Sequence, residues 1–128
     1  MRISIAQLEQ KVSIQNQVSL DFTIGANGWV ADFADPVTFL DLFVTGGGNN
    51  WTNWSSQEYD QLIARTSQTT DPQDRFEIFQ QAEALLLESA PVTPLSFGAR
   101  TYLLHPAVKN WEPSPLGFHR LQAVRLAD

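Results

Sequence analysis

Apolar residues fall on alternate positions in two stretches near the N-terminal end of the chain. Ile3 and Ile5 follow this period within residues 2–8, and the same period runs through residues 18–24. A period of two places apolar side chains on one face of a strand, so we expect strands in both stretches. Residues 9–17 between them are polar with sparse apolar positions, which predicts a short helix or a loop.

The period changes to that of a helix in the middle of the chain. Ser55 and Glu58 form the pattern of a capping box, which predicts a helix that runs to about Thr66. A second helix is predicted from Asp71 as N-cap, through Pro72, to about residue 89. The predicted apolar face of the first helix consists of Tyr59, Leu62, Ile63 and Thr66. The predicted buried stripe of the second helix consists of Phe76, Phe79, Ala82 and Leu86, widened by Ile78 and Leu85.

Two irregular segments lie between the predicted strands and helices. Residues 28–36 read GWVADFADP, and Asp35 before Pro36 is typical of an N-cap at the start of a helical turn. The run of three glycines at residues 46–48 predicts a loop, because glycine loses the most backbone freedom in regular structure.

The C-terminal part of the chain predicts only short elements. Residues 92–97 are β-like, but Pro94 confines them to an edge or a strand start. Residues 102–104 predict another short strand, and residues 118–126 suggest one more. Several prolines interrupt the tail, which has the character of a strap that lies against another body. The order of elements therefore predicts an α/β domain with a mixed sheet and two main helices.

Composition and charge narrow the functional class. The chain has 128 residues, 43% of them hydrophobic and 17% charged, which is typical of one globular domain. The net charge of −6 argues against binding to nucleic acid and to anionic membranes. The absence of cysteine excludes disulfides, thiolate metal sites and a cysteine nucleophile. The sequence shows no signal-peptide pattern and no apolar run long enough to span a membrane.

Two groups of side chains suggest chemistry on their own. Asp32 and Asp35 have the residue type of a hydrolase acid–base pair, and Trp51 and Trp54 could stack on a sugar in a carbohydrate-binding module. No set of nucleophile, base and orienting group can be assembled, and neither histidine has the spacing of a metal ligand. We therefore expect a protein that is not an enzyme and that uses no cofactor and no metal.

Several motifs in order resemble one protein family. GWVADFADP (28–36) is preceded by LDFTIGAN (20–27) and followed by TFLDLF (38–43), NNWTNW (49–54), SSQEYDQLIART (55–66) and DPQDRFEIFQQAEALLLESAPVTPLSF (71–97). This order resembles the C-terminal part of family 5 extracellular solute-binding proteins. These are the oligopeptide-, dipeptide- and nickel-binding receptors of ABC importers. The resemblance covers about residues 2–126.

The resemblance implies a partial lobe of a periplasmic-binding-protein type II-like fold. Residues 1–105 would form a lobe portion of a single domain, residues 106–128 would form a proline-rich crossover tail, and most of the partner lobe would be missing. It also implies a periplasmic or cell-surface location, an ABC permease as partner of the full-length receptor, and a peptide or other small solute as ligand. The exposed lobe surface would favour a homo-oligomer.

The resemblance also implies a ligand site. In peptide-binding members the aspartate of this signature faces the cleft and pairs with the N-terminal ammonium of the ligand, and Asp32 is the matching position. Trp29 and Phe33 would shape the wall of the site, and Trp51 and Trp54 are further candidates for ligand contact. Some members carry an arginine just before the Gly-Trp pair, whereas Ala26 and Asn27 occupy that stretch here.

Overall fold

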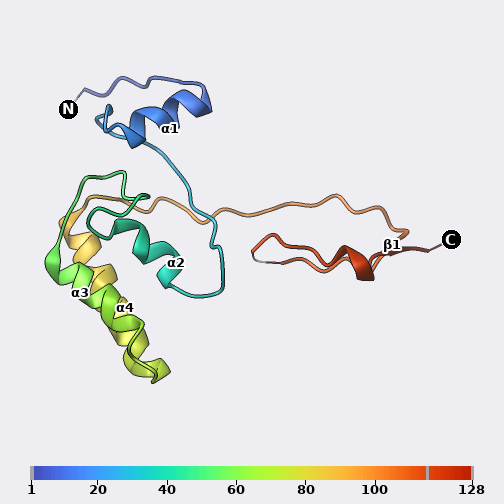
Figure 1. The fold of residues 1–128 in the computed structure, drawn as a ribbon. Helices are drawn as coiled ribbons and strands as arrows, with labels where there is room; N and C mark the ends of the chain where they lie inside the picture. The colour runs from blue at the N-terminus through green and yellow to red at the C-terminus, as the bar shows by residue number, and fades with distance from the viewer. Residues whose placement is uncertain (1, 115, 128) are drawn as a thin grey trace.

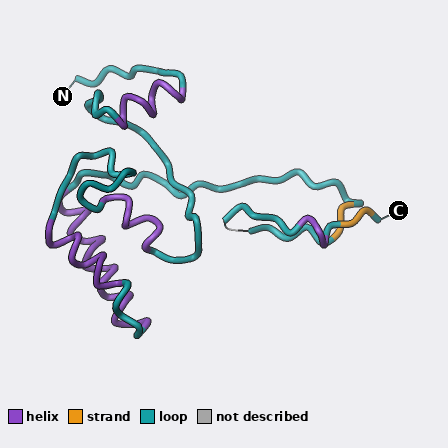
Figure 2. Tube along the Cα trace, viewed as in Figure 1, coloured by secondary structure: helices purple, strands orange, loops and turns teal. Residues whose placement is uncertain are grey.

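The computed structural model describes residues 2–114 and 116–127, and in that part of the chain the main regular elements are helices, joined by long loops (Figures 1 and 2). Pro115, one of the prolines of the predicted tail, lies outside the described residues. No helix in the described part combines the length and apolar character that crossing a membrane requires. The elements in chain order are α1 (Gln10–Val18), α2 (Val37–Leu40), η1 (Asp41–Phe43), α3 (Gln57–Thr66), α4 (Pro72–Ser89), β1 (Val108–Lys109), η2 (Leu121–Ala123) and β2 (Arg125–Leu126).

The core lies where α3 and α4 pack side by side and α2 contacts α4 (Figure 1). Tyr59 has no exposed surface, and its ring packs edge-on against Trp54 with a centroid distance of 5.0 Å. The Tyr59 hydroxyl donates a 2.6 Å hydrogen bond to the Leu40 carbonyl, which ties α3 to α2. Six buried residues form the core cluster: Tyr59, Leu62, Ile63, Ile78, Ala82 and Leu86.

The predicted apolar face of α3 is confirmed, and that of α4 requires one correction. All four residues predicted for α3 are buried, as are Ile78, Phe79, Ala82 and Leu86 of α4. Phe76 is 51% exposed, so its place in the buried stripe was wrong. Phe76 and Ile78 are separated by about 200° around the helix, so they cannot face the same neighbour. Ile78 takes the position in the core.

The helix caps are partly as predicted. The Asp71 carboxylate accepts hydrogen bonds from the backbone N–H groups of Gln73 and Asp74, at 2.9 and 3.0 Å, which confirms the N-cap of α4. The N-cap of α3 is Ser56 and not Ser55. Ser56 has the extended backbone of a cap, and its Oγ accepts the Tyr59 N–H at 3.2 Å.

The long predicted strands are absent from the described part of the chain. Residues 2–8 are irregular, α1 occupies residues 10–18, and no strand forms at residues 18–24, 92–97 or 102–104. The only sheet there is the antiparallel pair of β1 and β2, in which Val108 lies opposite Leu126. A strand requires a backbone partner in a ladder, and the alternating segments find none in this structure. The result is a partial α/β domain in place of the predicted mixed sheet.

Residues 93–127, excluding Pro115, form a C-terminal arm that extends away from the helices (Figure 1). The rings of Trp111 and His119 stack within it at a centroid distance of 4.1 Å, and Tyr102 packs edge-on against both. The strand predicted at residues 118–126 is confirmed only in the two residues of β2. The folded part of the arm is therefore stabilised by contacts between its own residues.

Candidate functional site

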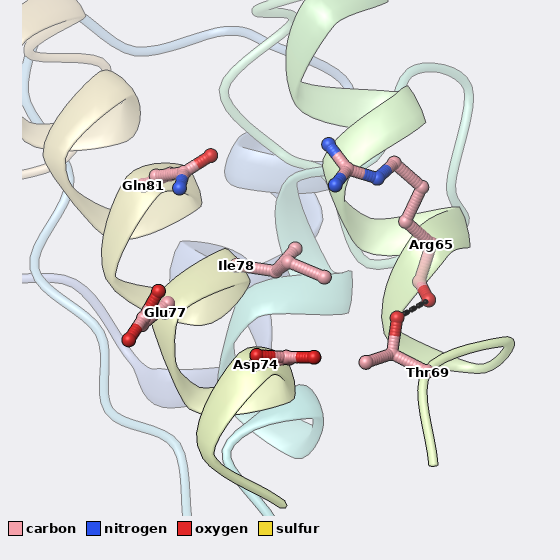
Figure 3. Close-up of a pocket in the computed structure, with 6 residues that line it drawn as sticks. All are labelled: Arg65, Thr69, Asp74, Glu77, Ile78 and Gln81. Atoms are coloured by element: carbon pink, nitrogen blue, oxygen red, sulfur yellow. Dashed lines mark hydrogen bonds between the residues drawn. The ribbon is translucent and has the colours of Figure 1, made fainter. Parts of the chain in front are cut away.

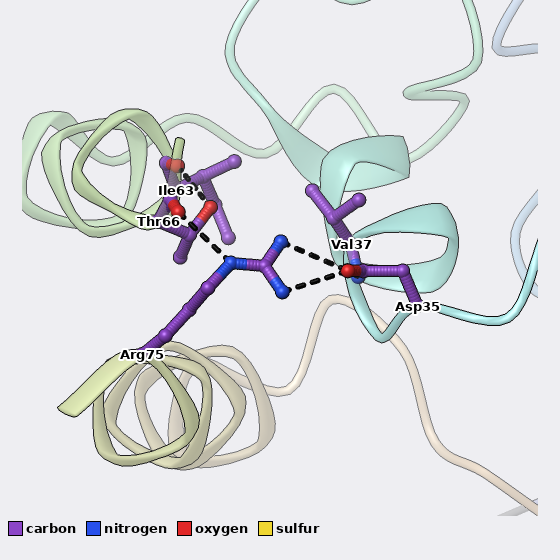
Figure 4. Close-up of polar contacts among 5 residues, drawn as sticks. All are labelled: Asp35, Val37, Ile63, Thr66 and Arg75. Atoms are coloured by element: carbon purple, nitrogen blue, oxygen red, sulfur yellow. Dashed lines mark hydrogen bonds and ion pairs between the residues drawn. The ribbon is translucent and has the colours of Figure 1, made fainter. Parts of the chain in front are cut away.

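The signature segment, residues 28–38, is attached to the helices by an ion pair (Figure 4). Arg75 Nη1 donates to Asp35 Oδ2 at 2.7 Å, and Arg75 Nη2 donates to Asp35 Oδ1 at 3.1 Å. Asp35 Oδ1 also accepts the Val37 backbone N–H at 2.9 Å, so Asp35 makes the predicted kind of bond to the helical turn, although Pro36 occupies the N-cap position of α2. One carboxylate thus begins a helical turn and binds α4.

Arg75 makes two further contacts from the first turns of α4. Its Nε–H donates to the Thr66 carbonyl at the end of α3 at 2.9 Å, and its guanidinium lies 4.6 Å from the centre of the Phe79 ring. The planar guanidinium presents several donors in a fixed fork, so one side chain can bind a carboxylate and a carbonyl together. Arg75 therefore joins the signature segment, α3 and α4.

The ion pair has an electrostatic consequence for both partners. The hydrogen bonds from Arg75 lower the pKa of the Asp35 carboxyl, with help from the Val37 N–H and against the effect of partial burial. The same bonds raise the pKa of Arg75. Asp35 is therefore ionised at neutral pH and is already occupied by a cation. This arrangement does not suit a hydrolytic acid with Asp32 as its partner.

Asp32 is placed differently from Asp35. Its backbone N–H donates to Oγ1 of the buried Thr38 at 3.1 Å, whereas the residue as a whole is exposed. Its carboxylate makes no hydrogen bond or ion pair within residues 2–114 and 116–127. The backbone of Asp32 is thus fixed, and its charged group faces solvent.

Trp29 and Phe33 also keep much of their surface exposed. Trp29 is 39% exposed and Phe33 is 50% exposed, and neither belongs to the core cluster. Both lie within a few residues of Asp32 in the signature segment. This segment therefore presents one carboxylate and two aromatic rings on a short length of backbone.

Trp51 and Trp54 lie in a compact turn that the glycine run begins. The Asn50 side-chain amide donates to the carbonyls of Phe43, Val44 and Trp54, at 3.1, 3.1 and 2.9 Å. Trp54 packs on the core through Tyr59, and Trp51 Nε1 donates to the Gly48 carbonyl at 3.2 Å. In the described part of the chain, no hydrogen bond or aromatic contact joins either ring to the signature segment. The two tryptophans stabilise this turn.

A concavity lies elsewhere, between α3 and α4, and has a volume of about 260 Å³ (Figure 3). Ligand pockets are mostly apolar with a few polar groups, whereas this concavity is mostly polar. Thr69 Oγ1 at its edge is already bound to the Arg65 carbonyl at 2.9 Å. None of the residues predicted for the site lines it; its lining consists of Arg65, Thr69, Asp74, Glu77, Ile78 and Gln81.

The sequence pattern missed the residues that hold the signature segment. Arg75 is separated from Asp35 by 40 positions, so no local period connects them. Thr38 contributes its side-chain oxygen and Thr66 its backbone carbonyl. A pattern of apolar positions does not reveal either contact. The signal that was available is Asp35 before a proline, which predicts a cap but not a partner.

The sequence was compared with family models and with curated proteins. No family model matches the sequence. Over 116 residues, or 91% of its length, the chain is 35% identical to the dipeptide-binding protein DppE of Bacillus subtilis and covers 21% of that protein. This match agrees with the resemblance to the C-terminal part of the family 5 extracellular solute-binding proteins.

One solved structure and a more distant relative extend this comparison. A substrate-binding domain of an oligopeptide ABC transporter from Bacillus anthracis matches 95% of this chain with a TM-score of 0.77 and 30% identity, and the chain covers 24% of that domain. A probable deoxycholate-binding periplasmic protein of Escherichia coli is 27% identical over 84% of the chain and is 20% covered. The chain thus spans about a fifth of the length of the curated relatives it matches.

Proposed function

We propose that this chain contributes part of the ligand site of a peptide receptor for an ABC importer, with Asp32 as the contact for the ligand's N-terminal ammonium. The observation that supports this most is the placement of Asp32, whose backbone is fixed by Thr38 while the residue is exposed. A carboxylate and an ammonium form a charge-assisted hydrogen bond, which supplies both energy and orientation in a cleft. The peptide-binding relatives give the ligand class.

The finer assignment follows from the same proposal. Trp29 and Phe33 are exposed next to Asp32, and we assign them to the wall of the site. We assign Trp51 and Trp54 to the support of the site, because their contacts lie in the turn and in the core. Residues 1–105 form a lobe portion of a type II fold, and residues 106–128 form a tail that crosses to the other lobe. The receptor works in the periplasm or at the cell surface with a permease.

A complete cleft is needed to test Asp32, so residues 2–126 are placed in the matching stretch of the Bacillus subtilis dipeptide-binding protein. Titration calorimetry then compares Asp32→Asn with the unchanged receptor. We expect binding of a dipeptide with a free N-terminus to weaken about tenfold, because a hydrogen bond to a charged group contributes about 1.5–3 kcal/mol. Affinity for the N-acetylated dipeptide is expected to be equal in the two receptors.

The control is Glu83→Gln, which removes one carboxylate from the exposed face of α4. It is expected to leave both affinities unchanged. If Asp32→Asn weakens the two dipeptides equally, or neither of them, Asp32 does not bind the ammonium. Tighter binding of deoxycholate than of the dipeptide would move the ligand class toward that of the Escherichia coli relative.

A further inference from the structure

The segment that carries Asp32 is held to the rest of the molecule at a small number of points. Within it, the Thr38 N–H donates to the Asp35 carbonyl at 3.2 Å, and the Asp32 N–H donates to Thr38 Oγ1 at 3.1 Å. These bonds close residues 32–38 into a compact loop. Thr38 is 2% exposed and marks the buried end of this loop.

Arg75 is the polar link from this loop to the α3–α4 pair, and Val37 of the loop also packs against the core cluster (Figure 4). Two of its nitrogens hold both oxygens of Asp35, and a third holds the Thr66 carbonyl. The guanidinium also lies over the Phe79 ring, and Phe79 is only 4% exposed. The buried Phe79 ring therefore helps to fix Arg75, and Arg75 fixes the Asp35 carboxylate of the loop.

We infer that Arg75 is a positioning residue for the ligand contact: through Asp35 it sets where the loop presents the Asp32 carboxylate. This inference rests on the proposed function of Asp32. Arg75 itself contacts Asp35, Thr66 and Phe79, so it acts on the ligand only through the loop. A lysine keeps the charge but offers a single ammonium, which cannot reproduce the paired bonds to Asp35 together with the bond to Thr66.

The first test uses the 128-residue chain without ligand. Amide hydrogen exchange measured by NMR compares Arg75→Lys with Arg65→Lys, a control at an exposed position of α3. We expect the Asp32 amide to exchange at least tenfold faster in Arg75→Lys, because the loop opens more often. The amides of Ile78 and Ala82 in α4 are expected to keep their rates. A role in global stability alone would speed all three amides, and unchanged exchange at Asp32 would overturn the inference.

The second test separates positioning from ligand contact in the complete receptor described above. We expect Arg75→Lys to weaken binding of the free-amine dipeptide at least threefold, and to have no effect once Asp32 is already Asn. An equal loss in both backgrounds would show that Arg75 does not act through Asp32. If Asp32→Asn has no effect on binding, the proposed function fails, and the exchange rate of the Asp32 amide still decides whether Arg75 holds the loop.

Discussion

Asp35 shows how one residue can serve two structural purposes at once. Its carboxylate receives donors from its own helical turn and from Arg75 on α4. Both sets of bonds favour the ionised form, and together they outweigh partial burial. The contribution of Asp35 to stability therefore depends on its charge, and pH is the means to test it.

The folded pKa of Asp35 lies below its ordinary value of 3.8. Its contribution to stability is therefore complete above that value, and it is lost as the pH falls through the folded pKa. We expect Asp35→Asn to lower the free energy of unfolding by about 1 kcal/mol at neutral pH, as for a partly exposed ion pair. The difference from the unchanged chain should shrink below about pH 4. Urea unfolding at a series of pH values measures it, and a difference that grows in acid would contradict the assignment.

The local sequence predicted the capping role of Asp35 but not its ion pair with Arg75. An aspartate before a proline indicates a cap because the signal and its target lie within a few positions. Arg75 offered no such signal, since its partners are set by how α4 packs against α2 and α3. The same limit applies to Asp32: its type and motif position are visible in the sequence, whereas its hydrogen bond to Thr38 is not.

At the scale of elements, the N-terminus of α3 offers a matched pair of serines. Ser56 caps the helix through Tyr59, and Ser55 precedes it. We expect Ser56→Ala to lower the free energy of unfolding by about 1 kcal/mol, the usual effect of removing a cap. Ser55→Ala should change it by less than about 0.5 kcal/mol, as for other exposed positions. The midpoints of urea unfolding of the two variants show which serine caps the helix. A larger effect at Ser55 would support the capping box predicted from the sequence.

Helices and strands differed in how well the sequence predicted them. The bounds of α3 and α4 were predicted closely because a helix satisfies its backbone within itself and its apolar face appears as a period. The alternating segments carry an equally clear period, but a strand also needs a neighbour. Residues 2–8 and 18–24 have none in this structure, and their apolar side chains are exposed.

At the scale of the whole molecule, exposed apolar side chains predict self-association. Ile5 is 94% exposed, and Phe97 and Leu103 are fully exposed, in segments that the sequence predicts to be strands. Large apolar surfaces seldom remain uncovered in water. We expect light scattering to show a dimer or larger assembly of the 128-residue chain, and Phe97→Ser to shift it toward the monomer. A monomer at all concentrations would contradict this prediction.

The C-terminal arm has a consequence for the order in which the chain folds. The core cluster spans residues 59–86, and the stacking of Trp111 on His119 and the pairing of β1 with β2 lie wholly within later residues. Contacts between residues near in sequence form quickly, because little loop entropy is lost in closing them. We therefore expect the helical part to pack before the arm has left the ribosome during synthesis, and the arm to form its own contacts afterwards without reopening the core.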